Sequence, residues 1–206
     1  MLVGLLALFG PASVEAGEFK GRVQGVVADS PAVVWIEGLS GDVPEHNTVV
    51  IRTDSGFQSY VELGFVGNHF VLRNEDHKLH NIHLYMQLGY QEAVSQRPLR
   101  LGATLYNMAL PRAGMEAKRP IKFYHRYRDD TGFIEVISNT HPEKKAYILV
   151  FDHPFATVTE ADGSFSIPNV PPGEHKVRFW RNSQVRNWGT VKIGGSQSTN
   201  VVIESE

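Results

Sequence analysis

Apolar and polar residues alternate along most of the chain in short runs that are separated by turns. From residue 19 to residue 28, apolar or small side chains alternate with charged or amide side chains. A period of two is typical of a half-buried β-strand. The same pattern predicts further strands in the first half of the chain at 33–37, 48–53, 59–63 and 69–74.

The second half of the chain continues in the same way. Residues 147–151 are apolar throughout, which predicts a central strand, and the Asp162-Gly163 turn between alternating runs predicts a hairpin. Residues 86–120 are less regular and contain several prolines, so we expect a long connection with one short helix near Glu92. Other strands are expected at 121–126, 132–138, 175–180, 188–193 and 198–204. The sequence therefore predicts an all-β protein built as β-sandwiches.

Composition narrows the classes of function. The 206 residues, 42% of them apolar, have room for one large β domain or two small ones. Lys plus Arg is 20 and Asp plus Glu is 22, so the net charge of −2 gives no electrostatic basis for binding nucleic acid. The chain has no cysteine, which excludes disulfides, zinc–thiolate sites and a cysteine nucleophile.

The N-terminus predicts export. Residues 2–9 are an apolar run, and Val14-Glu15-Ala16 follows as a small-residue cleavage site, so residues 1–16 are expected to be a signal peptide. No basic residue precedes the run, and the alternative is a buried first strand or helix. The run is too short to span a bilayer and no other segment is longer, so we expect a periplasmic or secreted protein without a membrane span.

Two histidine-containing stretches stand out. The first, at 74–82, reads Asn-Glu-Asp-His-Lys-Leu-His-Asn-Ile, and the second, at 134–142, reads Ile-Glu-Val-Ile-Ser-Asn-Thr-His-Pro. With these contexts, the chain resembles the plastocyanin-like cupredoxins of the exported bacterial type over roughly residues 20–180. The resemblance implies a Greek-key β-sandwich that carries a mononuclear copper site.

The resemblance also implies a ligand set. In that family, copper takes one histidine at the start of a strand and then a cysteine, a histidine and usually a methionine from one later loop. The histidine positions fall on His80 and His141, the cysteine position on Ser138 and the methionine position on Lys144. A serine hydroxyl cannot replace a thiolate near pH 7, and a lysine ammonium repels Cu²⁺ unless it points into water. A blue electron-transfer site is therefore disfavoured.

The remaining histidines can form a different site. His77, His80 and His83 are three residues apart, so on an extended strand they cannot all face one side. His77, in a turn, or His125, one predicted strand earlier, is a candidate third ligand beside His80 and His141. Water or a serine would complete a site that suits Cu(II), Ni(II) or Zn²⁺. The alternative is that these are surface histidines that share no ion.

Other residues of these chemical types are expected to be structural. His153 lies in an Asp-His-Pro stretch that matches the family, and we expect a buried, hydrogen-bonded imidazole where two halves of the protein meet. Met86, Met108 and Met115 share no metal-binding spacing and are expected to pack in the core.

The C-terminal part resembles a different family. Residues 157–180, with turns at 161–163 and 170–173, are similar to a carboxypeptidase regulatory-like module, which implies a transthyretin-like or carbohydrate-binding-like sandwich. The expected division is a cupredoxin-like domain at 17–150 and this module at 151–206. Trp180 and Trp188 would make a carbohydrate platform if both were exposed on one face, but a core position for Trp180 is favoured.

No nucleophile elbow, phosphate-binding glycine loop or H-E-x-x-H motif occurs, so no enzyme is expected. The leading hypothesis is a periplasmic cupredoxin-like protein that either binds copper or another divalent ion through His80 and His141 or keeps the fold after losing the metal. The first alternative is a metal-free structural or carbohydrate-binding module that acts with a partner. The third is electron transfer like that of its relatives. A redox or envelope protein is the expected partner, which the sequence does not identify.

Overall fold

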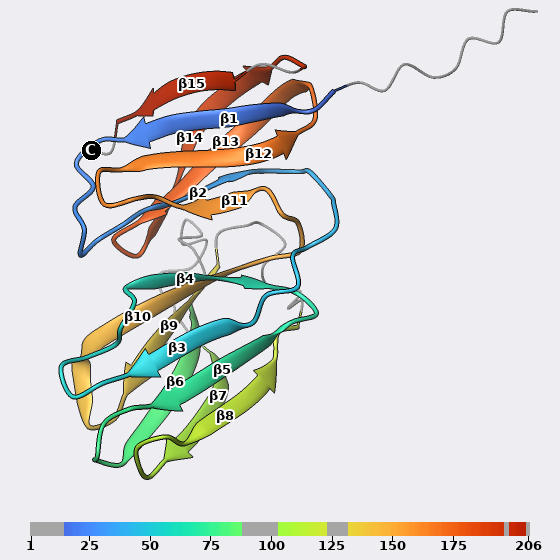
Figure 1. Cartoon of the computed structure of the whole chain (residues 1–206). Helices are drawn as coiled ribbons and strands as arrows, with labels where there is room; N and C mark the ends of the chain where they lie inside the picture. The colour runs from blue at the N-terminus through green and yellow to red at the C-terminus, as the bar shows by residue number, and fades with distance from the viewer. Residues whose placement is uncertain (1–14, 88–102, 123–131, 196–197, 205–206) are drawn as a thin grey trace, which may run out of the picture.

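The structure, a computed structural model, describes residues 15–87, 103–122, 132–195 and 198–204. Over these ranges the chain forms fifteen β-strands and no helix, which confirms the predicted all-β class. The strands make four sheets in two lobes, and each lobe is a sandwich of two sheets (Figure 1). Within the described ranges, accordingly, no helix is available to cross a membrane.

The terminal lobe is built from both ends of the chain. One of its sheets has the strand order β12-β1-β15 and the other has the order β11-β2-β13-β14. Phe19, Val34 and Phe165 are among the buried residues that fill the space between these sheets. The strands of this lobe are β1 (Gly17–Val23), β2 (Val33–Ile36), β11 (Ala156–Val158), β12 (Ser164–Val170), β13 (Gly173–Arg181), β14 (Gln184–Ile193) and β15 (Ser198–Ile203).

The central lobe contains the middle of the chain. Its larger sheet has the order β4-β10-β9-β6-β7 and its smaller sheet the order β3-β5-β8. Phe70, Ile82 and Ile148 belong to the apolar core between them. The strands of this lobe are β3 (Thr48–Arg52), β4 (Val61–Phe65), β5 (His69–Asn74), β6 (His80–Gln87), β7 (Ala103–Leu110), β8 (Glu116–Pro120), β9 (Phe133–Ser138) and β10 (His141–Phe151).

A third buried cluster, called the interlobe core below, joins the two lobes. It is formed by residues of β2 and β13 from the terminal lobe and of β4, β9 and β10 from the central lobe. The Trp180 ring lies 5.0 Å from the Tyr147 ring, and the Trp35 ring lies 5.6 Å from the Phe151 ring, measured between centroids. Strand β2 is buried on both faces, because alternate side chains enter the terminal-lobe core and the interlobe core.

The expected division at residue 150 separates strands that share sheets. Strand β1 pairs with β12 and β15, and β2 pairs with β11 and β13, so residues 17–36 belong with residues 156–203. The physical reason is burial, because the apolar sides of both early strands are covered by strands from the end of the chain. The resemblance at 157–180 therefore covers only part of the lobe.

Two other expectations need correction. The segment 86–120 was expected to be a connection, but the structure places β7 and β8 within it, while the helix expected near Glu92 lies outside the described residues. A strand was expected at 121–126; residues 121 and 122 are not in a strand, and the rest lies outside the described residues. The central strand expected at 147–151 is confirmed, since this part of β10 lies between β4 and β9.

Candidate metal centre

Two turns meet at one end of the central lobe. One joins β5 to β6, and the other is the tight Asn139-Thr140 turn between β9 and β10. Strands β6 and β9 pair so that Ile82 lies opposite Ser138. His80, the first residue of β6, therefore lies beside the second turn. The backbone N–H of Asn139 donates to the carbonyl oxygen of Asn81 at 3.1 Å and fixes the two turns together.

The turn before β6 is organised by Asn74, the buried last residue of β5. Its Nδ2 donates to the carbonyl oxygens of Lys78 and Leu110 at 2.9 and 2.8 Å, and its Oδ1 accepts from the backbone N–H of Asp76 at 2.9 Å. Asparagine favours such turns because its short side chain can bond to the backbone two residues on. The result is that the Asp76 carboxylate is held directly beside His80.

Both ring nitrogens of His80 have partners inside the protein. The side chain has no exposed surface, and Nε2 lies 2.8 Å from Oδ2 of Asp76, which is 6% exposed. The hydrogen bond from His80 lowers the pKa of Asp76, so this carboxyl is ionised at neutral pH and Nε2–H must be the donor. When His80 is neutral, its lone pair is therefore on Nδ1.

Two hydroxyl groups lie in front of that lone pair. The Oγ of Ser138 and the Oγ1 of Thr140 are each 2.9 Å from Nδ1 of His80, and they are 2.9 Å from one another. One hydroxyl can donate to Nδ1 while the other donates to the first, which satisfies the buried nitrogen. The position that the resemblance assigns to a thiolate is thus filled by a hydrogen-bonded hydroxyl.

His141 lies next to His80, but it forms no hydrogen bond with Asp76, His80, Ser138 or Thr140. The ring centroids of His80 and His141 are 6.4 Å apart. Two imidazoles sharing one ion at a tetrahedral angle, with bonds of about 2.0 Å, would have centroids roughly 5 Å apart. The His141 side chain is 39% exposed and its Nδ1 is 3.5 Å from Oε1 of Glu143. It therefore has free space on its solvent side in which to move.

A buried cation, Arg52, interacts electrostatically with the Asp76 carboxylate. Arg52, the last residue of β3, is fully buried; its Nη1 donates to the carbonyl oxygen of Thr53 at 2.6 Å, and its guanidinium lies 5.4 Å from the Phe57 ring centroid. Burial lowers the pKa of Arg52, and the negative charge of Asp76 acts in the opposite direction. Two buried charges of opposite sign reduce the cost of burying each other.

The other expected ligands do not join the site. His77 is exposed, and the part of the chain that the structure describes holds no group of three His, Cys, Asp or Glu side chains suited to a metal ion. His125 lies outside the described residues. Lys144 is exposed, so the cation expected near the methionine position is in water.

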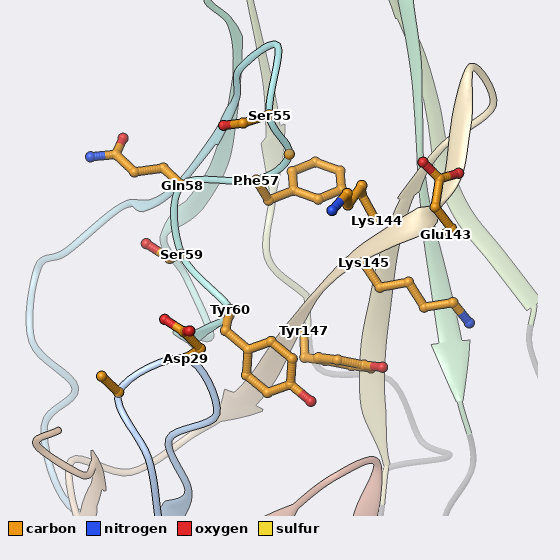
Figure 2. A pocket seen from close by; sticks show the side chains of 12 residues that line it. Asp29, Ser55, Phe57, Gln58, Ser59, Tyr60, Glu143, Lys144, Lys145 and Tyr147 are labelled. Atoms are coloured by element: carbon orange, nitrogen blue, oxygen red, sulfur yellow. The ribbon is translucent and has the colours of Figure 1, made fainter. Parts of the chain in front are cut away.

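Lys144 lines a polar pocket of about 480 Å³ beside this end of the lobe (Figure 2). The pocket is formed by the 55–60 segment, by residues 143–147 of β10 and by Ala28 and Asp29 of the terminal lobe. The rings of Tyr60 and Tyr147 are in edge contact, with centroids 5.2 Å apart. The pocket lining carries two lysines and two acidic residues, so it has no excess charge to select an ion.

His83 points away from His80, as the alternation along β6 predicts. Its neighbours Ile82 and Leu84 belong to the central core, whereas His83 stacks on Tyr85 with ring centroids 5.3 Å apart. The ring is buried, and burial lowers its pKa. Within the described parts of the chain, neither ring nitrogen has a hydrogen-bond partner. A neutral imidazole is therefore favoured at this position.

The expected structural residues lie where they were predicted. His153 is buried, and its Nδ1 accepts from the backbone N–H of Phe155 at 3.2 Å. Met86 and Met108 are in the central core, and Met115 packs partly buried against it. Trp180 has no exposed surface and Trp188 packs partly buried against the terminal-lobe core, so these two rings do not form an exposed carbohydrate platform.

Asp76, His80 and Ser138 are also the residue types of a hydrolase triad. In such a triad the serine hydroxyl attacks a substrate carbonyl that reaches it from a cleft. Ser138 has no exposed surface, so no substrate can reach its Oγ in this structure. The hydrogen bonds from Asp76 and Ser138 fix the orientation of the His80 ring.

Sequence reasoning missed two members of this group, Asp76 and Thr140. A signal existed for Asp76, because Asn74-Glu75-Asp76 is an Asn-x-Asp turn that ends four positions before His80. Thr140 lies between Ser138 and His141 in sequence, but only the tight turn places its hydroxyl on the His80 side.

No family model matches the sequence, and no curated protein matches it. Solved structures that are similar to part of the chain include a purple cupredoxin from Nitrosopumilus maritimus. It has 14% identity and a TM-score of 0.36, over 50% of this chain and 99% of that chain. A methionine-to-alanine variant of amicyanin in the Cu(I) form has 12% identity and a TM-score of 0.34, over 57% and 98%. Similarities this distant assign no family, and what the structure establishes is an all-β fold of two sandwiches.

Proposed function

We propose that the protein binds a divalent ion such as Cu(II) through His80 and His141, as a cupredoxin-like protein that lacks the thiolate of the blue copper site. The observation that supports this most is the Asp76–His80 hydrogen bond. It holds Nε2, so that the lone pair of neutral His80 is on Nδ1, facing Ser138 and Thr140, and the centroid of the His141 ring lies 6.4 Å from that of His80. A carboxylate behind a histidine ligand orients the ring and makes it a stronger donor.

The donor set decides which ions fit. Two imidazoles with two neutral hydroxyls suit Cu(II), Zn²⁺ or Ni(II), and they do not suit the trigonal histidine–cysteine plane of a blue copper site. A bound ion would supply a positive charge and a coordination position for water or for an anionic group. The chain's own residues supply the rest: Asp76 orients His80, and the buried hydroxyls of Ser138 and Thr140 lie beside Nδ1.

Binding is expected to be of modest affinity, since two changes must precede it. An ion at Nδ1 of His80 must displace a hydroxyl hydrogen bond, and the His141 ring must approach His80 by about 1 Å from its present 6.4 Å separation. The half-exposed position of His141 permits this movement. We also propose that the protein is exported, because the apolar run at 2–9 and the cleavage-site pattern at 14–16 are typical of a signal peptide.

A calorimetric titration with Cu²⁺, read in parallel by electron paramagnetic resonance, tests the proposal. We expect one ion per chain, and His141→Ala should weaken binding at least about tenfold, or 1.4 kcal/mol, because half of the nitrogen donors are lost. His46→Ala, at an exposed histidine of the same lobe, is the matched control and should bind as the unmodified protein does. No binding below about 0.1 mM, equivalent to roughly 5–6 kcal/mol, would reject the proposal.

The same experiment decides the second candidate, a metal-free structural module. The observation that favours it is the closed triangle of His80, Ser138 and Thr140, which satisfies the buried nitrogen without an ion. If this candidate is correct, Cu²⁺ binds no more tightly to the protein than to its His141→Ala variant.

A further inference from the structure

The segment Asp152–Phe155 is the link from the central lobe back to the terminal lobe. It joins β10 to β11, and it is anchored at both ends by backbone hydrogen bonds. The carbonyl oxygen of Phe151 accepts from the N–H of Val66 at 2.9 Å, and that of Phe155 accepts from the N–H of Ile36 at 3.0 Å. Phe151 belongs to the interlobe core and Phe155 to the terminal-lobe core, so this segment ties the two together.

His153 is the centre of that link. Its side chain is 4% exposed and lies between two aromatic rings, with centroids 5.3 Å from Phe151 and 6.1 Å from Phe155. Nδ1 accepts a hydrogen bond from the backbone N–H of Phe155 at 3.2 Å. A nitrogen that accepts from an N–H cannot carry a proton itself, so His153 is neutral in this arrangement, with its proton on Nε2.

Adding a proton to Nδ1 conflicts with every one of these contacts. The new N–H would face the N–H of Phe155, the acceptor would be lost, and a cation would be buried between hydrocarbon rings. Among the described residues, Asp152 is the charged group whose field acts on the ring, and it favours the proton. Burial outweighs Asp152 and lowers the pKa of His153.

We propose that His153 is an acid-sensitive latch between the lobes, whose protonation releases the Asp152–Phe155 segment and loosens the interlobe contact while both lobes stay folded. The direction follows from linkage. Released His153 has an ordinary pKa of about 6.5, so it takes up protons more readily than the latched form as the pH falls below that value. The latch is therefore closed above about pH 6.5 and opens progressively in acid.

Amide hydrogen exchange on the full chain tests this at two hydrogen bonds, the one from the Phe155 N–H to His153 and the one from the Ile36 N–H to the Phe155 carbonyl oxygen. After correction for the pH dependence of chemical exchange, protection of the Phe155 and Ile36 amides should fall at least about fivefold between pH 7.5 and pH 5. Protection in the central-lobe strand β9 should change much less. Unchanged protection of the Phe155 amide at pH 5 would overturn the proposal.

Variants identify the group that titrates. His153→Asn keeps a side-chain oxygen that can accept from the Phe155 N–H but cannot be protonated, so its exchange at Phe155 should no longer depend on acid. His46→Asn, at an exposed histidine, and His83→Asn, at the other buried histidine whose pKa burial lowers, should both keep the acid effect. Loss of the effect in His83→Asn and not in His153→Asn would overturn the proposal.

A measurement on the unmodified protein covers the case in which His153→Asn fails to fold. In a proton NMR titration of the imidazole resonances, the midpoint of His153 should lie below the ordinary histidine value of about 6.5. A midpoint equal to or above about 6.5 would show that the latched ring tolerates its charge, and would overturn the proposal.

Discussion

At the scale of single residues, the histidine end of the central lobe depends on what faces Nδ1 of His80. A thiolate there would be a strong metal ligand, whereas the hydroxyls of Ser138 and Thr140 are neutral and also bond to one another. The triangle of His80, Ser138 and Thr140 therefore satisfies the buried nitrogen without a metal ion. Its contribution to the free energy of unfolding can be measured in the absence of any ion.

Removing one hydroxyl should cost less than removing both. In Ser138→Ala or Thr140→Val, the remaining hydroxyl still donates to His80, so we expect a loss of unfolding free energy below about 1 kcal/mol. The double variant leaves a buried acceptor unpaired and should lose about 1–3 kcal/mol. Urea denaturation of the four proteins at pH 7 gives the coupling energy. Strict additivity of the two single effects would contradict the triangle.

The residues of the candidate site were predictable to different degrees. His80, His141 and Ser138 were named from their sequence contexts, and the structure brings them to one end of the lobe. Lys144 could not be placed from sequence, because the register of β10 shifts between His141 and Lys145. His77 has a favourable spacing from His80, but it lies exposed in the turn that Asn74 and Asp76 define.

At the scale of elements, strands with clear alternation were predicted and strands without it were missed. Strand β5 has the predicted bounds of 69–74. Strand β8 (Glu116–Pro120) is almost wholly exposed and charged, and only its pairing with β5 makes it a strand. Such an element depends on a long-range neighbour, so no local pattern of apolar residues can reveal it.

The turn before β12 allows a test of how closely Gly163 approaches β1. Gly163 has φ of +84°, and a methyl group on it would clash with the carbonyl oxygen of Val23 in β1. Gly67 has φ of +92° but open space around it, so it is the matched control. We expect Gly67→Ala to cost about 1–2 kcal/mol and Gly163→Ala at least about 3 kcal/mol, by urea denaturation. Equal costs would show that the β1 contact is not tight.

At the scale of the whole molecule, the two lobes are not independent halves of the chain. A chain ending at residue 150 would lack the strands that pair with β1 and β2, so the apolar side chains of these two strands, Trp35 among them, would be exposed. We expect residues 17–150 alone to show no cooperative thermal transition. The full chain should unfold in one transition that coincides by circular dichroism and by tryptophan fluorescence.

Two outcomes would contradict that expectation. One is a cooperative transition for residues 17–150 alone, and the other is a pair of separate transitions for the full chain. The sequence could not anticipate this arrangement, because its local patterns give strands and turns but not which distant strands pair. The burial of β2 on both faces was the available hint, since four successive apolar residues, Val33 to Ile36, fit a strand between two cores.

The pairing of β1 with β15 affects when the protein can fold during synthesis. Lys20 of β1 lies opposite Asn200 of β15, which is 200 − 20 = 180 positions away, and its other neighbour, β12, is also late in the chain (Figure 1). During synthesis, the first strand has no partner until most of the polypeptide has been made. Contacts so distant along the chain are slow to form, and an unpaired apolar strand invites aggregation meanwhile. The terminal lobe should therefore reach its native state only after β12 and β15 have been made, and a chaperone that shields the early strands should raise the yield of folded protein.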